Sequence, residues 1–184
     1  MFEVEVKVRA DLDAVRDRLL ARGAEPVNDV TQVDTYFDAP HRDFAETDEA
    51  IRIRREHRED DTTARLTYKG PLVDADSKTR EEVEASIANG DDVRAIFENL
   101  GFEPAATVRK DRERFRVDGC TVTLDAVADV GEFVEVETAA ETEAEIDAAR
   151  ESAFAVLRDL ELDPDEQVCT SYLGMLLAGE DSSE

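Results

Sequence analysis

The segment FEVEVKVR, residues 2–9, sets the pattern on which the fold prediction rests. Apolar and charged side chains alternate in it without interruption, with Val4 and Val6 in one set and Glu5 and Lys7 in the other. Successive side chains of a β-strand point to opposite faces of a sheet, so this segment predicts a strand with one apolar and one charged face. Which face lies inward determines what such a sheet can bind.

Strands and helices follow one another along most of the chain. Seven later segments have the alternation or the composition of strands: 30–37, 50–55, 65–69, 80–87, 108–117, 120–128 and 132–138. Apolar stripes and capping residues predict four helices: one after Asp11, one from Asp91 or Asp92, one opened by the capping box of Thr142 with Glu145, and one from Asp163 to about Ala178.

These elements predict one α+β domain over residues 1–178, because no repeat or linker divides the pattern. Residues 179–184 are predicted to be a disordered acidic tail. We expect the strands to form a closed eight-stranded antiparallel β-barrel with flanking helices, since closure leaves no strand edge open to other chains.

The composition disfavours several classes of protein. Among 184 residues, 47 are acidic and 22 basic, and the net charge of −25 argues against binding to nucleic acid polymers. No apolar run approaches the ~18 residues of a membrane span, and charges stand where a signal peptide would be apolar. Cys120 and Cys169 match neither a disulfide framework nor a zinc-ligand spacing. We expect a soluble cytoplasmic protein that binds no membrane.

The basic residues are distributed unevenly. Only four of the 22 are lysines, Lys7, Lys69, Lys78 and Lys110. An acidic, lysine-poor chain is typical of a halophilic protein, because at ~1 M salt charges are screened within ~3 Å. Loss of structure at low salt would support this interpretation, and an ordinary acidic protein is the alternative.

The predicted hairpins bring particular charges together. Asp118-Gly119 fits a two-residue turn, which sets Arg112 opposite Asp125. Residues 129–131 fit a three-residue loop, which sets Asp125 opposite Glu135. Facing carboxylates repel unless a cation lies between them, so this pair is a candidate site for a hard divalent ion. The alternative is a solvent-facing ladder, which costs little in a salt-adapted protein.

Basic side chains recur on the same alternate positions as the acids. Lys7, Lys69 and Lys110 all occupy such positions, and arginines accompany them. Guanidinium and ammonium groups suit phosphate oxygens, while carboxylates hold the Mg²⁺ or Mn²⁺ that bridges the same oxygens. A barrel with this face inward is therefore predicted to bind a polyphosphate. The alternative is a barrel whose charged side chains face solvent and whose aliphatic side chains fill the centre.

The motifs resemble those of the CYTH, or triphosphate tunnel metalloenzyme, superfamily, and within it the class IV adenylyl cyclases. The resemblance covers nearly the whole chain. It is carried by Glu3-Val4-Glu5-Val6-Lys7, similar to the family's ExExK signature, and by the segments at 34–38, 51–54, 69–71, 79–84, 110–112, 124–127, 131–137 and 171–173.

The resemblance implies a role for each matched residue. It implies catalytic roles for Lys7, beside the reacting phosphate, and Glu5. Phosphate oxygens would be held by Arg52, Arg54, Lys69, Arg80, Lys110 and Arg112. Mg²⁺ or Mn²⁺ would be held by Glu3, Glu5, Asp125, Glu135 and Glu137. Glu82 and Glu84 would face inward and pair with basic residues or hold a second metal ion.

The leading hypothesis is a metal-dependent adenylyl cyclase that converts ATP to 3′,5′-cyclic AMP and pyrophosphate. The alternative is a phosphohydrolase that uses the same tunnel to hydrolyse inorganic or organic triphosphates. A non-catalytic binder of nucleotides or polyphosphate is a third reading, although such a protein would tolerate loss of the metal-binding acids. A homodimer is left open by the sequence.

Overall fold

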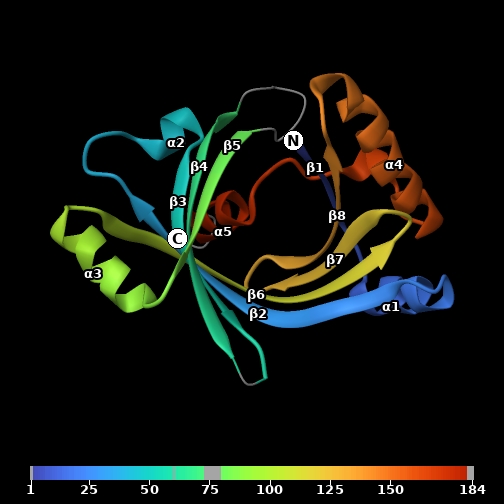
Figure 1. The fold of residues 1–184 in the computed structure, drawn as a ribbon, viewed down its shortest axis with the longest axis horizontal. Coiled ribbons are helices and arrows are strands. Elements are labelled where there is room, and N and C mark those ends of the chain that lie inside the picture. The colour runs from blue at the N-terminus through green and yellow to red at the C-terminus, as the bar shows by residue number, and fades with distance from the viewer. Residues whose placement is uncertain (1, 60, 73–79, 182–184) are drawn as a thin grey trace.

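The computed structural model describes residues 2–59, 61–72 and 80–181, and all eight predicted strands are present (Figure 1). The elements in chain order are β1 (Phe2–Arg9), α1 (Leu12–Ala21), β2 (Glu25–Asp38), α2 (Phe44–Thr47), β3 (Ala50–His57), β4 (Thr62–Leu72), β5 (Arg80–Ile87), α3 (Gly90–Asn99), β6 (Glu103–Val117), β7 (Cys120–Val127), β8 (Gly131–Ala140), the 3-10 turn η1 (Glu143–Glu145), α4 (Ile146–Asp159), the 3-10 turn η2 (Pro164–Glu166) and α5 (Tyr172–Asp181).

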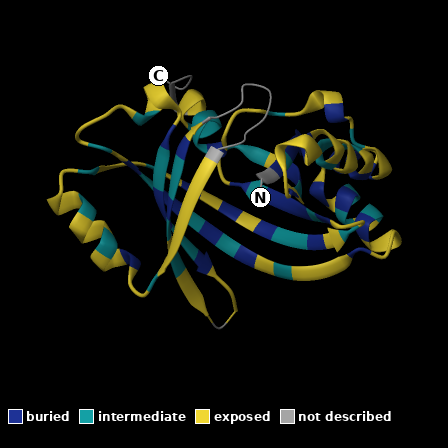
Figure 2. Cartoon of the chain, turned by 45° about the horizontal axis from the view of Figure 1, so that its top comes forward, coloured by how far each residue is buried: buried dark blue, intermediate teal, exposed yellow. Residues whose placement is uncertain are grey.

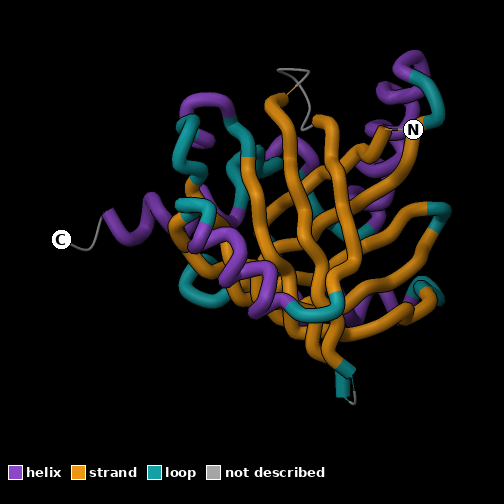
Figure 3. The backbone as a smooth tube through the Cα atoms, turned by 60° about the vertical axis from the view of Figure 1, so that its left-hand side comes forward, coloured by secondary structure: helices purple, strands orange, loops and turns teal. Residues whose placement is uncertain are grey.

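The strands form one antiparallel sheet in the order β1-β8-β7-β6-β2-β3-β4-β5. Figure 3 shows them side by side as a strongly curved surface. Such curvature follows from the right-handed twist that accumulates across neighbouring strands. The molecule is therefore an α+β protein built on one curled sheet.

The sheet is an open half-barrel, so the expected closure of the barrel is not confirmed. Within the described residues, β1 pairs only with β8 and β5 only with β4. The outer edge of β1 contacts the chain after η2 instead, because the Val168 N–H donates to the Lys7 carbonyl at 2.7 Å. β5 is exposed along most of its length (Figure 2). Strand number alone could not predict this, since a segment outside the sheet covers part of one edge.

The first predicted hairpin register is confirmed. β6 and β7 join through Asp118-Gly119, and Arg112 lies opposite Asp125. Both turn residues have positive φ, 50° for Asp118 and 78° for Gly119, as a two-residue turn between twisted strands requires. The local turn chemistry was therefore sufficient to fix this pairing.

The second predicted register was wrong by two residues. The loop between β7 and β8 is 128–130, which sets Asp125 opposite Phe133 and Thr123 opposite Glu135. Gly131 is the first residue of β8 and not a loop residue. Because side chains alternate with a period of two, Asp125 and Glu135 nevertheless remain on the same face.

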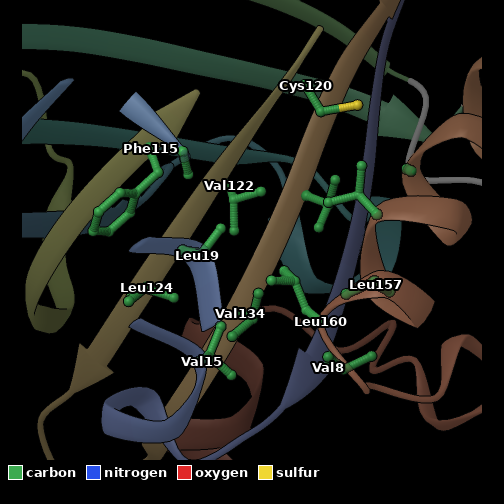
Figure 4. Packing of buried hydrophobic residues seen from close by; sticks show 14 of the residues in the cluster. Val8, Val15, Leu19, Phe115, Cys120, Val122, Leu124, Val134, Leu157 and Leu160 are labelled. Atoms are coloured by element: carbon green, nitrogen blue, oxygen red, sulfur yellow. The ribbon is translucent and has the colours of Figure 1, made fainter. Parts of the chain in front are cut away.

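The two faces of the sheet differ sharply in chemistry. Helices α1 and α4 cover the convex face and pack on the apolar side chains of β1, β6, β7 and β8. Figure 4 shows Leu19 of α1 and Leu157 of α4 beside Val122 and Val134 of the sheet. The charged side chains consequently lie on the concave face, in which α5 sits (Figure 1).

The last predicted helix is broken into η2 and α5. Helix α5 begins at Tyr172 because the Ser171 hydroxyl accepts the Gly174 N–H at 3.0 Å, which caps the first turn. It continues to Asp181, so the first part of the expected disordered tail is helical, while residues 182–184 lie outside the described residues. No helix in the described part of the chain has both the length and the apolar character needed to span a membrane.

The packing of α4 on the sheet predicts a large difference between two leucines. Leu157 is 0% exposed and Leu20 is 52% exposed. We expect Leu157→Ala to lower the free energy of unfolding by about 2–5 kcal/mol, because it leaves a cavity in the core. The same change at Leu20 should alter it by less than about 0.5 kcal/mol. Urea denaturation at constant salt measures both, and equal losses would contradict this placement of the core.

Candidate functional site

The concave face gathers most of the charged residues predicted to form the site. Val4, Val6 and Val8 of β1 face the apolar core, so the intervening Glu5 and Lys7 face the concave side. The same alternation on other strands places there Arg52, Arg54, Lys69, Lys110, Arg112, Asp125, Glu135 and Glu137. The side chains of Glu3 and Arg80 lie outside the described residues.

Asp34 of β2 is the centre of one cluster of basic groups. Its carboxylate accepts two hydrogen bonds from Arg54, each 2.7 Å long, and one of 3.3 Å from Arg52. The Lys110 ammonium lies 3.9 Å from the same carboxylate. Burial alone would raise the pKa of Asp34, but the charges of these three basic groups hold it well below its usual range. One carboxylate thus orients three predicted phosphate-binding side chains.

Arg112 is the centre of a second cluster. It donates to Asp125 through Nε at 2.6 Å and through Nη2 at 2.5 Å, and Nη2 also donates to Glu135 at 2.7 Å. Sequence reasoning placed a cation between these two acids, and the cation here is the guanidinium. Burial would raise the pKa of Glu135, but Arg112, Lys110 and Lys7 lower it, so the carboxyl stays ionised.

Glu5 and Glu137 form an acid pair that the sequence prediction did not identify. They lie directly opposite each other on β1 and β8, on the same face as Glu135. The pKa of Glu137 is raised by burial first and then by the charge of Glu5. A cation between the two carboxylates would relieve this repulsion, so the pair provides oxygen ligands of the kind that Mg²⁺ and Mn²⁺ prefer.

The carboxylates of Glu5, Glu137 and Glu135 are suitable ligands for a hard divalent ion, but they do not form a complete metal site in this structure. Among the described residues, no three acidic, His or Cys side chains stand close enough to form a ready metal site. Rotation of Glu135 toward Glu5 and Glu137, or a contribution from Glu3, would supply the third ligand. The chemistry of these oxygen donors therefore fits a hard divalent ion.

Two lysines meet over one aromatic ring. The Nζ atoms of Lys7 and Lys110 lie 4.2 Å and 5.1 Å from the centre of the Tyr172 ring. Burial first, then the charges of Arg112 and Arg54, lower the pKa of Lys110 to about 7. The hydroxyl of Tyr172 donates to Asp125 at 2.9 Å, and burial raises its pKa, so it remains a donor.

A further buried polar cluster on this face was missed from the sequence. Gln32 donates to Glu56 through a short hydrogen bond, and Arg114 lies 3.6 Å from the same carboxylate. Within the described structure, Gln32 Oε1 and Arg52 Nε are buried and lack a hydrogen-bond partner. Buried polar atoms are nearly always paired, so the unpaired Nε–H of Arg52, which belongs to the Asp34 cluster, is left for an acceptor from a ligand.

The outer strands carry the more exposed members of the site. Lys69 of β4 pairs with Glu82 of β5 at 3.0 Å, and Arg65 pairs with Glu84 at 2.5 Å. Glu82 and Glu84 therefore pair with basic residues, as predicted. The side chain of Lys69 is 30% exposed, so this residue lies at the rim of the concave face.

Asp34 and Tyr172 are the important residues to which sequence reasoning gave no role. Both belong to motifs quoted for the family resemblance, Asp34 at the start of 34–38 and Tyr172 within 171–173. The signal for Asp34 was its alternate position on a predicted strand. Tyr172 gave no such signal, because its place beside β1, β6 and β7 depends on how the carboxyl end folds back.

Comparisons with known proteins identify the family of the chain. The family model described as the CYTH domain matches residues 1–172. A Methanocaldococcus jannaschii protein named "Putative adenylate cyclase" is 38% identical over 174 residues, which cover 94% of this chain and 97% of that protein. The adenylate cyclase CyaB of Aeromonas hydrophila is 29% identical over 146 residues, which cover 78% of this chain and 72% of that protein.

Solved structures share the fold. The PH1819 protein of Pyrococcus horikoshii has a TM-score of 0.88 and 37% identity, covering 96% of this chain and 98% of that one. A Hippeastrum protein with 18% identity has a TM-score of 0.69, covering 97% and 95% of the two chains. Because the family model matches residues 1–172, this chain belongs to the CYTH domain family.

Proposed function

We propose that the concave face binds a triphosphate with a divalent metal ion and converts ATP to 3′,5′-cyclic AMP and pyrophosphate. The proposal is supported above all by the unpartnered, buried Nε of Arg52, a residue that shares the Asp34 carboxylate with two of four other basic groups on the concave face. These groups are Arg54, Lys110, Arg112 and Lys7. Membership of a family of triphosphate-binding enzymes and the names of the relatives support it as well.

The basic groups would do most of the catalytic work by position. Arg52, Arg54 and Lys110, already aligned by Asp34, would hold phosphate oxygens and stabilise the negative charge that grows on pyrophosphate as it leaves. Because these groups are held in place before the substrate arrives, little of the binding free energy is lost in ordering them. The ribose 3′-oxygen would attack the α-phosphorus in line with the departing pyrophosphate.

A divalent metal would be held by Glu5 and Glu137, with Glu3, Asp125 and Glu135 as further ligands. When bound, Mg²⁺ or Mn²⁺ would lower the pKa of the attacking hydroxyl and neutralise charge on the phosphate oxygens. The chain's own acids would also keep the two lysines oriented toward the substrate.

Hydrolysis of triphosphates is the second candidate. The Hippeastrum protein of the same fold is described as having a dominant triphosphatase activity. The same basic groups would serve this reaction if a water molecule, in place of the ribose hydroxyl, attacked the terminal phosphorus. The difference between the two reactions lies in which phosphorus meets the nucleophile.

We expect the purified chain to form cyclic AMP and pyrophosphate from ATP with Mn²⁺. Chromatography of the products at low and at high salt measures this, with inorganic tripolyphosphate as a parallel substrate. Orthophosphate without cyclic AMP would reject the cyclase and favour the triphosphatase. No turnover of either substrate would leave only a binding role.

Glu137→Gln should separate activity from stability. Because burial and the charge of Glu5 raise the pKa of Glu137 above its usual value, the stability associated with this group falls as pH rises from the ordinary to the raised pKa, and the ionised carboxylate destabilises the fold above it. Removing the charge should leave the melting temperature at pH ~7 unchanged or higher. Mn²⁺ affinity should fall by at least ~10–100-fold, the loss typical of even an outer-shell partner.

Glu81→Gln is the matched control, because Glu81 is an exposed strand glutamate one position away from the concave face. It should leave both measurements unchanged. Normal Mn²⁺ binding by the Glu137→Gln protein would remove Glu137 from the metal site.

Binding of tripolyphosphate without metal should take up a proton through Lys110. Its pKa of about 7 means that the amine is largely neutral at about pH 8, whereas a bound anion favours the charged form. Affinity should fall about tenfold from about pH 6 to about pH 8. Calorimetry in buffers of different ionisation enthalpy measures the uptake.

In the control variant Lys110→Arg, the side chain stays charged from about pH 6 to about pH 8. Any proton uptake that remains in this variant comes from ionisation of tripolyphosphate itself. The variant should bind without the extra proton. Equal proton uptake by both proteins would show that another group titrates.

A further inference from the structure

The segment Val168–Tyr172, called the strap here, crosses the outer edge of β1 and enters the concave face. The Val168 N–H donates to the Lys7 carbonyl at 2.7 Å, and the Thr170 carbonyl accepts from Lys7 Nζ at 2.8 Å. The strap therefore holds both the backbone and the side chain of one residue in the site. Ser171 then caps α5, which fixes Tyr172 as the first helical residue.

Tyr172 contacts groups from four strands at once. Its ring lies under the ammonium groups of Lys7 on β1 and Lys110 on β6, at 4.2 Å and 5.1 Å. Its hydroxyl donates to Asp125 on β7 at 2.9 Å. The ring also packs against Phe133 of β8, with centroids 5.0 Å apart. The side chain is buried, so these contacts are made away from bulk water.

The electrostatics of this arrangement favour a preorganised site. Two ammonium groups close together repel each other, and the electron-rich face of an aromatic ring offsets part of that repulsion. A free lysine side chain loses rotamer entropy when it binds a phosphate, and a lysine that is already held loses less. A hydrogen bond to a carboxylate likewise fixes the direction of its remaining lone pairs.

We propose that Tyr172 is a positioning residue, whose ring holds Lys7 and Lys110 for the triphosphate and whose hydroxyl orients Asp125 for the metal. This rests on the proposed function, because it assigns the two lysines and Asp125 to those ligands. Tyr172 would act through Lys7, Lys110 and Asp125.

Two variants separate the ring from the hydroxyl. Tyr172→Phe keeps the ring and the packing on Phe133 but loses the bond to Asp125, so Mn²⁺ affinity should fall about tenfold. Its affinity for metal-free tripolyphosphate should stay within about twofold of wild type, because the contact of the ring with both lysines remains. Tyr172→Leu removes both functions and should also weaken tripolyphosphate binding by about 3- to 30-fold.

The measurements are Mn²⁺ binding by electron paramagnetic resonance and tripolyphosphate binding by calorimetry, followed by kcat and KM. Leu177→Ala is the matched control, since Leu177 lies on the same helix and is 41% exposed. A general loosening of α5 would lower both affinities in parallel in every variant, the control included, and would overturn the proposal. If Tyr172→Leu does not fold, the Tyr172→Phe result alone decides.

Two failures are distinguishable. A wild-type protein that binds no tripolyphosphate overturns the proposed function and, with it, the role of Tyr172. A wild-type protein that binds tripolyphosphate and Mn²⁺, together with Tyr172 variants that bind both equally well, overturns the positioning role alone.

Discussion

The bidentate contact between Arg112 and Asp125 is the interaction on which the concave face depends. Both side chains are buried, and a charge removed from water is tolerated only when it is paired and hydrogen-bonded. Arg112 also neutralises Glu135, while Asp34 does the same for Arg52 and Arg54. The result is a set of buried charges, on neighbouring strands, that neutralise one another.

The open sheet gives the carboxyl end of the chain its role. A closed barrel would have paired β1 with β5, and no segment could then have reached Lys7 from outside the sheet. The strap instead bonds to the edge of β1 and brings an aromatic ring into the concave face. The site is thus composed of strands that are distant in sequence and of the last helix.

Cyclisation and hydrolysis make similar demands on such a site. Both require phosphate oxygens to be held by fixed positive charge and the leaving group to be stabilised as it departs. Neither requires a nucleophilic side chain, which agrees with a concave face made of acids, arginines and lysines. The two reactions differ in which phosphorus meets the nucleophile.

The sequence by itself determined the strands, the face on which each charge lies and the pairing of Arg112 with Asp125. These follow from local rules, namely the period of two in a strand and the turn chemistry of Asp118-Gly119. The tertiary structure alone decided the open edge, the β7–β8 register and the acid pair of Glu5 with Glu137. It also decided the position of Tyr172. These features depend on sheet curvature, on a loop without a distinctive turn sequence and on contacts between segments more than a hundred residues apart, for which periodicity carries no information.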